Sequence, residues 1–288
     1  MRPAYFRALL AGGLMVPSTA LAAQGAADPG AELRLSPLSL HETRTLPAGS
    51  AELAATAELL RYNHPDSSTS VTDLDLTPEF AFGLTDALEI GLSGPYRSRI
   101  DEDQGGGWRH IAGRITYRFL ELDQSASALT LQGSALNDNS DAQVSSGRNT
   151  YTAEWHMSGY SDTGATHIAL GYSERDYPLV QEEPVYENET EYYARWGFGY
   201  LLAPELAFTG ELNFDYGVQD EQGSLELMPG FRYTELESRF SVAMGLGFRP
   251  GTDDFRPNSR VMLSLTYRPA GTASLHERGD TLEQRLSS

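Results

Sequence analysis

The feature that most constrains this chain is a series of short segments, from about Ala51 to Tyr267, in which apolar and polar residues alternate. In one of them Leu74, Leu76, Pro78, Phe80, Phe82 and Leu84 share one parity, and Asp73, Asp75, Thr77 and Glu79 share the other. A period of two puts successive side chains on opposite faces of a β-strand. The helical period hardly appears, so the sequence predicts an all-β fold whose strands have two unlike faces.

Twelve such segments follow one another along the chain. They cover 52–61, 71–84, 88–93, 108–120, 126–136, 151–160, 166–172, 192–201, 206–216, 225–233, 240–248 and 260–267. The connections after even-numbered segments are brief, whereas most of those after odd-numbered segments are long, including 96–107, 137–148 and 174–190. An even strand count with alternating short turns and long loops is typical of outer-membrane barrels. We therefore expect a twelve-stranded antiparallel up-and-down transmembrane barrel over residues 51–267.

A soluble β-sandwich or lipocalin-like barrel would also alternate, because it too has one buried face. The phase of the loops and the aromatic residues at segment ends, such as Trp196, Tyr200, Phe248 and Tyr267, favour the membrane, where aromatic girdles mark the two interfaces. After residue 22 there is no run of 18 apolar residues that would predict a transmembrane helix.

The two ends of the chain lie outside the predicted barrel. Arg2 and Arg7, the apolar stretch 8–16 and the small-x-small site Ala20-Leu21-Ala22 predict a signal peptide over residues 1–22 and hence export. Residues 23–50 have no strong period and are expected to form either a periplasmic extension or a partial plug of the lumen. Residues 268–288 are expected to be a periplasmic tail, with a short helix over 273–286.

Composition removes several classes of chemistry. There is no Cys, which excludes disulfides, thiolate metal sites and cysteine nucleophiles, and all 21 basic residues are Arg, which excludes lysine Schiff bases and Walker-type phosphate loops. The net charge of −19 disfavours nucleic acid as a partner. The six His residues show no metal-binding spacing, so we expect neither a metal nor a cofactor.

One hairpin resembles a known family. The stretch Thr77-Pro-Glu-Phe-Ala-Phe-Gly-Leu-Thr-Asp-Ala-Leu-Glu-Ile-Gly-Leu92, followed by Gly113-Arg-Ile-Thr-Tyr-Arg118, is similar to the second to fourth strands of outer-membrane barrels of the MetA-pathway phenol-degradation or transporter-like family. The similarity covers about 60 residues. It is specific for a barrel hairpin and weak for a substrate, so it implies an uptake or channel role and names no solute.

If the apolar parity faces lipid, the other parity faces the lumen. Its charged residues are candidates for setting selectivity: Glu79, Glu89, Arg114, Arg118, Glu154, His156, Arg195, Glu211, Asp215, Glu226 and Arg232. An Arg facing lipid at the bilayer midplane costs roughly 2–4 kcal/mol, which supports this assignment. These groups could line an aqueous path or pair into a network that fills the barrel. The small lumen residues Gly91, Gly197, Gly199, Gly230, Ala243, Gly245 and Gly247 favour free space.

The external loops are acidic, and Glu182, Glu183, Glu187 and Glu189 lie in the longest one, 174–190. Such a mouth would concentrate cations, or the acids could keep the loops soluble and bind divalent ions at a lipopolysaccharide surface. The expected partners are outer-membrane lipids and lipopolysaccharide, the barrel-assembly machinery and an unidentified small solute.

Three functions compete for a barrel in the outer membrane of a Gram-negative bacterium. The leading prediction is a channel for passive or substrate-selective passage of small solutes, with cations or hydrophobic and aromatic compounds as options. The second is a closed structural or surface-binding barrel. The third, a lipid-modifying enzyme, depends on Trp155-His156-Met157-Ser158, which places a His and a Ser on one face, and it requires that face to be toward lipid. We expect no catalytic residue.

Overall fold

The computed structural model describes residues 35–40, 43–63, 70–100, 106–136, 150–176, 188–219, 221–235, 239–250 and 257–269. The expected signal peptide and the expected helix over 273–286 lie outside these ranges. Within them, no helix has the length and apolar character needed to cross a membrane.

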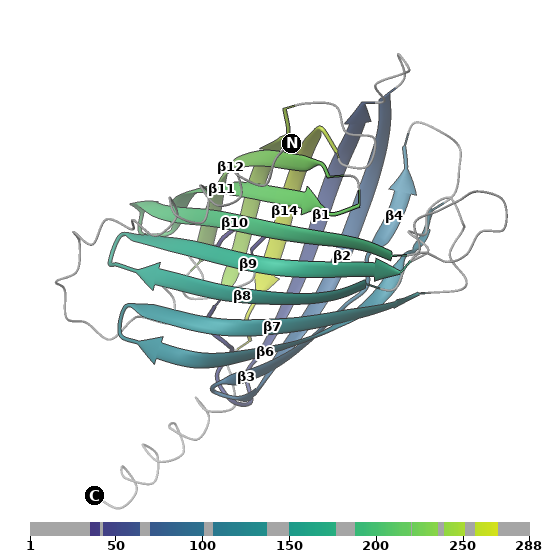
Figure 1. Ribbon diagram of the computed structural model, residues 1–288. Helices are drawn as coiled ribbons and strands as arrows, with labels where there is room; N and C mark the ends of the chain where they lie inside the picture. Colours follow the sequence, from purple (N-terminus) through teal and green to yellow (C-terminus); the bar gives the residue numbers. More distant parts are fainter. Residues whose placement is uncertain are drawn as a thin grey trace, which may run out of the picture.

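The structure is a single antiparallel sheet closed into a barrel (Figure 1). Its strands are β1 (Ala51–Asn63), β2 (Ser70–Thr85), β3 (Leu88–Ser93), β4 (Tyr96–Arg99), β5 (Gly106–Trp108), β6 (His110–Leu122), β7 (Ser125–Leu136), β8 (Thr150–Tyr160), β9 (Gly164–Asp176), β10 (Asn188–Ala203), β11 (Leu206–Gly217), β12 (Gly223–Glu235), β13 (Phe240–Phe248) and β14 (Ser259–Tyr267). Neighbouring strands of the sheet pair antiparallel, and β1 pairs with both β2 and β14. This double pairing closes the sheet into a barrel, as a bilayer requires.

The strands form twelve wall positions, which confirms the predicted architecture. Two wall positions consist of two strands each. Both β3 and β4 pair with β2, and their partners β6 and β5 are separated from each other only by Arg109. The break between β3 and β4 falls at Gly94-Pro95, because Pro has no N–H for the ladder. It is spanned by bonds from Gly94 N to Pro78 O (3.2 Å) and from Arg109 N to Pro95 O (2.8 Å).

The prediction that residues 96–107 form only a loop is wrong. The hairpin continues through β4 and β5, where Tyr96 pairs with Trp108 and their rings meet edge to face at 5.6 Å. Arg97 and Arg99 alternate inward against Asp75 and Asp73 on β2. A strand whose inward residues are charged and whose next parity holds Ser lacks the apolar alternation by which the other strands were found.

The outside of the barrel is apolar and the inside is polar. Large side chains at alternate positions are exposed on the outer face, among them Leu92 (58%), Ile111 (65%) and Ile115 (52%). Aromatic residues at strand ends, including Tyr117, Phe119, Tyr200, Tyr233, Phe248 and Tyr267, are exposed with them. Inward positions hold Ser, Thr, Ala and charged residues, most of them buried. This division of polarity is what a barrel in lipid needs, and it would expose a continuous apolar surface in water.

Candidate functional site

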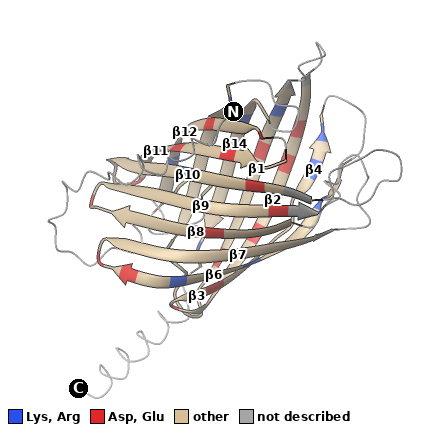
Figure 2. Ribbon diagram, in the orientation of Figure 1, with Lys and Arg blue, Asp and Glu red and all other residues tan. Residues whose placement is uncertain are grey.

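The eleven charged residues that the sequence assigned to the lumen lie on the inward parity of their strands, where each is buried or partly buried. Figure 2 shows acidic and basic positions distributed over many strands of the wall rather than gathered on one strand. Their contacts divide the lumen along its axis into a loop-side region and a turn-side region.

The loop-side region is built from paired charges. Arg97 forms a bidentate pair with Asp75, with both nitrogen–oxygen distances at 2.6 Å. Arg109 also reaches Asp75 (3.4 Å), and Arg99 reaches Asp73 (3.1 Å). Arg–carboxylate pairs of this bidentate kind are among the strongest polar contacts in proteins. The pairs therefore tie β2 to β4 and to Arg109, which lies between β5 and β6.

A second group of pairs lies along the arc of the wall from β11 to β14 and β1. Arg260 on β14 contacts Glu58 on β1 at 3.1 Å and Glu226 on β12 at 2.8 Å. Arg249, which follows β13, lies 3.3 Å from Asp215 on β11. These contacts join the wall strands β1, β11, β12 and β14 at one level.

On the opposite wall, Glu154 is buried between two partners. His156 Nδ1 lies 3.1 Å from its carboxylate and Arg195 Nη1 lies 3.8 Å from it. The guanidinium of Arg195 stacks over the Tyr193 ring at 4.4 Å. His156 Nε2 completes the contacts with Thr130 Oγ1 at 2.8 Å.

In the turn-side region, Arg114 bridges Glu79 (2.9 Å) and Glu89 (3.0 Å). Arg118 lies closer to the turns, where it contacts Glu121 (2.8 Å) and the backbone carbonyl of Asp86 (2.7 Å). Arg118 does not line either of the cavities described below.

The remaining two candidates, Glu211 and Arg232, contact the chain that precedes β1. Residues 35–40 and 43–50, here called the inner segment, bear polar backbone groups that meet inward side chains of the wall. Glu211 accepts bonds from Leu38 N, from Ser39 N (2.8 Å) and from Ser39 Oγ. Arg232 donates to Ser36 O (3.2 Å) and Pro37 O (2.7 Å). Both side chains are thus used to hold the inner segment.

Further polar contacts hold the inner segment from other strands. Leu46 N donates to Glu89 Oε2 at 2.9 Å, and Thr43 Oγ1 meets Ser158 Oγ on β8. His167 Nε2 on β9 lies 3.1 Å from Leu35 O. Backbone bonds between Gly83 and residues 49–50 fix the end of the segment at the turn side of β2.

Apolar contacts reinforce these bonds. Leu38 packs with Met228, Ala243 and Met262, and Leu35 packs with Ala165 and Ala207. These clusters place buried leucines of the inner segment against inward residues on both sides of the lumen. Burial of such side chains stabilises the arrangement by roughly 1.5–3 kcal/mol each.

The prediction that small lumen residues leave free space is wrong for the glycines beneath the inner segment. A Cβ at Gly197 would lie 2.9 Å from Leu40, and one at Gly199 would lie 2.9 Å from the Leu35 carbonyl oxygen. At Gly230 and Gly245 it would lie 2.6 and 2.8 Å from Leu38. These glycines make room for the inner segment, because any larger residue would overlap with it.

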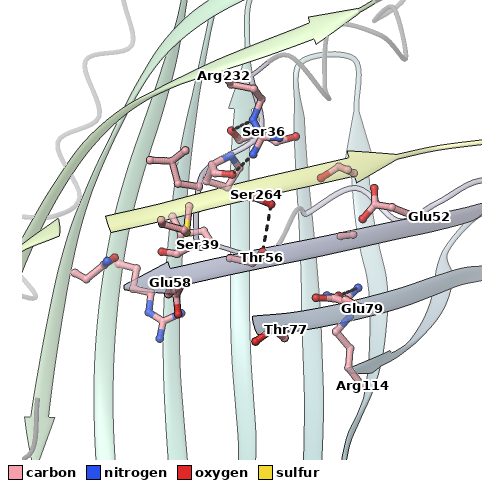
Figure 3. A pocket seen from close by; sticks show the side chains of 18 of the residues that line it. Ser36, Ser39, Glu52, Thr56, Glu58, Thr77, Glu79, Arg114, Arg232 and Ser264 are labelled. Carbon is pink, nitrogen blue, oxygen red and sulfur yellow. Dashed lines mark hydrogen bonds and ion pairs between the residues drawn. The ribbon is translucent and has the colours of Figure 1, made fainter. Parts of the chain in front are cut away.

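Two cavities of the lumen are lined by described residues. The loop-side cavity has a volume of about 510 Å³, and the turn-side cavity, between the inner segment and the wall strands β1, β2 and β14, has a volume of about 440 Å³ (Figure 3). Both are lined by Glu58, Arg195, Asp215, Glu226, Arg249 and Arg260. The two cavities therefore meet at the level of the Arg260 pairs.

The charges that line the two cavities balance. The arginines are Arg44, Arg97, Arg109, Arg114, Arg195, Arg232, Arg249, Arg260 and Arg268, and the carboxylates are Glu52, Glu58, Asp75, Glu79, Glu89, Glu154, Glu191, Asp215 and Glu226. With nine of each, these linings carry no net formal charge, although the whole chain carries −19. The excess acid of the chain is therefore located elsewhere.

The His-x-Ser pair does not form the arrangement that a lipid-modifying enzyme needs. His156 (1% exposed) and Ser158 (fully buried) face inward, away from lipid. Ser158 Oγ bonds to His167 Nδ1 at 2.7 Å, and its hydroxyl is covered by Thr43. Neither cross-strand contact is visible in the sequence, because each depends on register and on the inner segment.

The proposed acidic mouth is described only in part. Glu182, Glu183 and Glu187 lie outside the described residues, and for Glu189 in β10 only the backbone is described.

Sequence reasoning missed the contacts of the inner segment. The available signal was weak: Leu35, Leu38, Leu40 and Leu46 are spaced among Ser, Thr and Pro residues just before the first strand.

A closed twelve-stranded barrel with an apolar exterior and a charged interior belongs to the outer-membrane β-barrel class. No family model matches the sequence. No curated protein matches it either.

Solved structures share the fold. The COG4313 outer membrane channel from Pseudomonas putida F1 superposes with a TM-score of 0.60 at 12% identity, covering 80% of this chain and 99% of that chain. The NanC porin gives a TM-score of 0.54 at 9% identity, covering 75% of this chain and 98% of that one. At such low identity the similarity concerns the fold alone, that of an outer-membrane β-barrel.

Proposed function

We propose that this protein is an outer-membrane channel that passes small polar solutes by diffusion. The observation that carries the proposal is the pair of cavities of about 510 and 440 Å³, which share six lining residues and together extend from the loop side to the turn side of the lumen. A barrel that served only as a structural element would be expected to fill this space with side chains, as eight-stranded barrels do.

The chemistry of the lining favours polar solutes over aromatic or aliphatic ones. Nine Arg and nine carboxylates line the cavities together with Ser and Thr, whereas large apolar side chains such as Leu60 and Met262 are few among the lining residues. Aromatic ligands are usually bound in pockets lined mainly by apolar and aromatic side chains. The described lumen lacks such a surface.

The balance of charge argues for weak ion selectivity in the lumen. Each carboxylate at the junction of the cavities has an Arg neighbour, as Glu58 and Glu226 share Arg260. Paired charges give little net potential to attract either sign of ion. Any cation preference would then come from the external loops.

The resemblance of residues 77–92 and 113–118 to the MetA-pathway phenol-degradation or transporter-like barrels supports the same proposal. In this chain the stretch forms the hairpin β2–β3 and the middle of its next neighbour, β6. We propose membership of that family on the strength of this hairpin and the barrel fold, with polar rather than phenolic solutes as the cargo.

The test is single-channel conductance of the refolded protein in a planar bilayer, with the reversal potential measured in a salt gradient. We expect conductance steps and a cation-to-anion permeability ratio near unity. Glu58→Gln should shift the ratio toward anions and Arg260→Gln toward cations, because each removes one member of the same pair. A silent bilayer containing verifiably folded barrel would overturn the channel proposal.

A further inference from the structure

The inner segment contacts strands around much of the lumen. Its hydrogen bonds with wall side chains lie on β3 (Glu89), β8 (Ser158), β9 (His167), β11 (Glu211) and β12 (Arg232). Leu38 also packs against Met262 on β14, and residues 49–50 bond to Gly83 on β2. These contacts leave the turn-side cavity between the segment and the wall strands β1, β2 and β14.

The wall of this cavity formed by β1, β2 and β14 has a composition of its own. Small residues line it at successive inward positions: Ala54 and Thr56 on β1, Thr77 on β2, and Ser264 and Thr266 on β14. Thr56 pairs with both Thr77 and Ser264 in the sheet, and its hydroxyl donates to Ser264 Oγ at 3.2 Å (Figure 3). We call these five residues, of which all but Ala54 carry a hydroxyl group, the hydroxyl track.

Paired charges flank the hydroxyl track. Glu58 and Arg260 lie at its loop-side end, and Glu52 contacts Arg268 at its turn-side end. Glu79 and Arg114 lie beside Thr77 on the flank. Small side chains leave volume along the track, while the ion pairs at its two ends keep it polar without a net charge.

Resting on the proposed function, we propose that the inner segment is a resident plug and that solutes pass it along the hydroxyl track, off the barrel axis. The route enters through the loop-side cavity, passes the Arg260 pairs and continues between the inner segment and the wall strands β1, β2 and β14. Its polar lining without a net charge selects small neutral or zwitterionic solutes, whose hydrogen-bonding groups can exchange water for Ser and Thr hydroxyls.

The proposal also changes the roles expected of two sequence-predicted selectivity residues. Glu211 is turned to Leu38 and Ser39 and does not line either cavity, and Glu89 holds Leu46. Both act as positioning residues for the plug. Neutralising them should alter how the plug is held more than which ion the channel prefers.

The absence of Cys makes a direct test possible, because any introduced thiol is the sole target of a thiol reagent. Thr77→Cys places the thiol on the hydroxyl track. Thr209→Cys is the matched control: Thr209 is fully buried on β11, between Gly199 and Gly230, which the inner segment covers. Ser264→Cys is a second track variant in case Thr77→Cys does not fold.

Each variant is reconstituted and treated with 2-(trimethylammonium)ethyl methanethiosulfonate, and both the conductance and the extent of labelling by mass are recorded. We expect the Thr77→Cys thiol to be labelled rapidly and its conductance to fall by more than half, while Thr209→Cys is labelled at least tenfold more slowly and keeps its conductance. Labelling of Thr77→Cys without loss of current, or rapid labelling and block of Thr209→Cys, would overturn the off-axis route while leaving the channel intact.

Labelling separates the two proposals if no current is seen. Folded wild-type barrel without conductance overturns the channel function. In that case slow labelling of both Thr77→Cys and Ser264→Cys overturns the open track as well, whereas rapid labelling of both shows that water reaches the track in a barrel that does not conduct.

Discussion

At the scale of single residues, the lumen carboxylates differ by what they contact. Glu211 and Glu154 are both almost fully buried, yet Glu211 accepts three bonds from the inner segment, and Glu154 contacts His156 and Arg195 of the wall. Bonds to a charged acceptor contribute about 1.5–3 kcal/mol each. The carboxylate of Glu211 is thus a main anchor of the plug.

Glu211→Gln should therefore loosen the plug. The amide removes the charge and can accept through one oxygen only, so displacement of the inner segment should become about 1.5–3 kcal/mol easier, roughly a ten- to hundredfold rise in the open population. Single-channel recordings should show brief high-conductance states that are rare in wild type. Glu154→Gln is the control and should not show them, and equal behaviour of the two variants would argue against the anchor.

Residue types in this chain indicated which face each side chain would occupy and could not indicate its partner. The alternation around Glu79, Glu89 and Glu211 placed all three inward, as the structure has them. Two of them turn out to bind backbone N–H groups of a segment more than 40 residues away in sequence. The inner segment has no hydrophobic periodicity, because its conformation depends on the wall against which it packs. No local sequence pattern therefore predicts it.

At the scale of elements, the extended hairpin β4–β5 depends on its ion pairs. Outside the regular apolar alternation, Arg97 and Arg99 are held by Asp75 and Asp73 across the β2–β4 ladder. Strand prediction from period two failed here for this reason, since the inward residues are charged and the turn-like Gly94-Pro95 precedes them. The β2–β4 ladder is therefore stabilised by the carboxylates of Asp75 and Asp73 more than by the strand propensity of its residues.

Asp75→Asn should open this element without unfolding the barrel. The variant breaks the bidentate pair with Arg97 and the contact with Arg109, a loss of about 1–3 kcal/mol after allowance for partial exposure. Hydrogen exchange of residues 96–99 should accelerate roughly ten- to hundredfold, while β8 and β9 keep their protection. Asp123→Asn, at an exposed turn, is the control. Unchanged exchange in Asp75→Asn would show that the ladder holds without the pair.

At the scale of the whole molecule, the question is whether the plug moves when solutes pass. The closed wall does not need the plug for its pairing, since β1 is bonded along its length to both β2 and β14. Two mechanisms are then open to a plugged barrel: the plug leaves, or solutes go around it. The cavity along the hydroxyl track, between the plug and the wall, supports the second.

A covalent lock distinguishes these mechanisms. Thr43 on the inner segment and Ser158 on β8 have their hydroxyls in contact, so Thr43→Cys/Ser158→Cys should form a disulfide in this otherwise Cys-free chain. If solutes pass along the track, oxidised and reduced protein should conduct equally, because the route runs on the opposite wall. Loss of conductance on oxidation and its return with dithiothreitol would mean that the plug must leave. The single Thr43→Cys variant controls for the substitution itself, so a difference confined to the oxidised double variant would assign the effect to the tether.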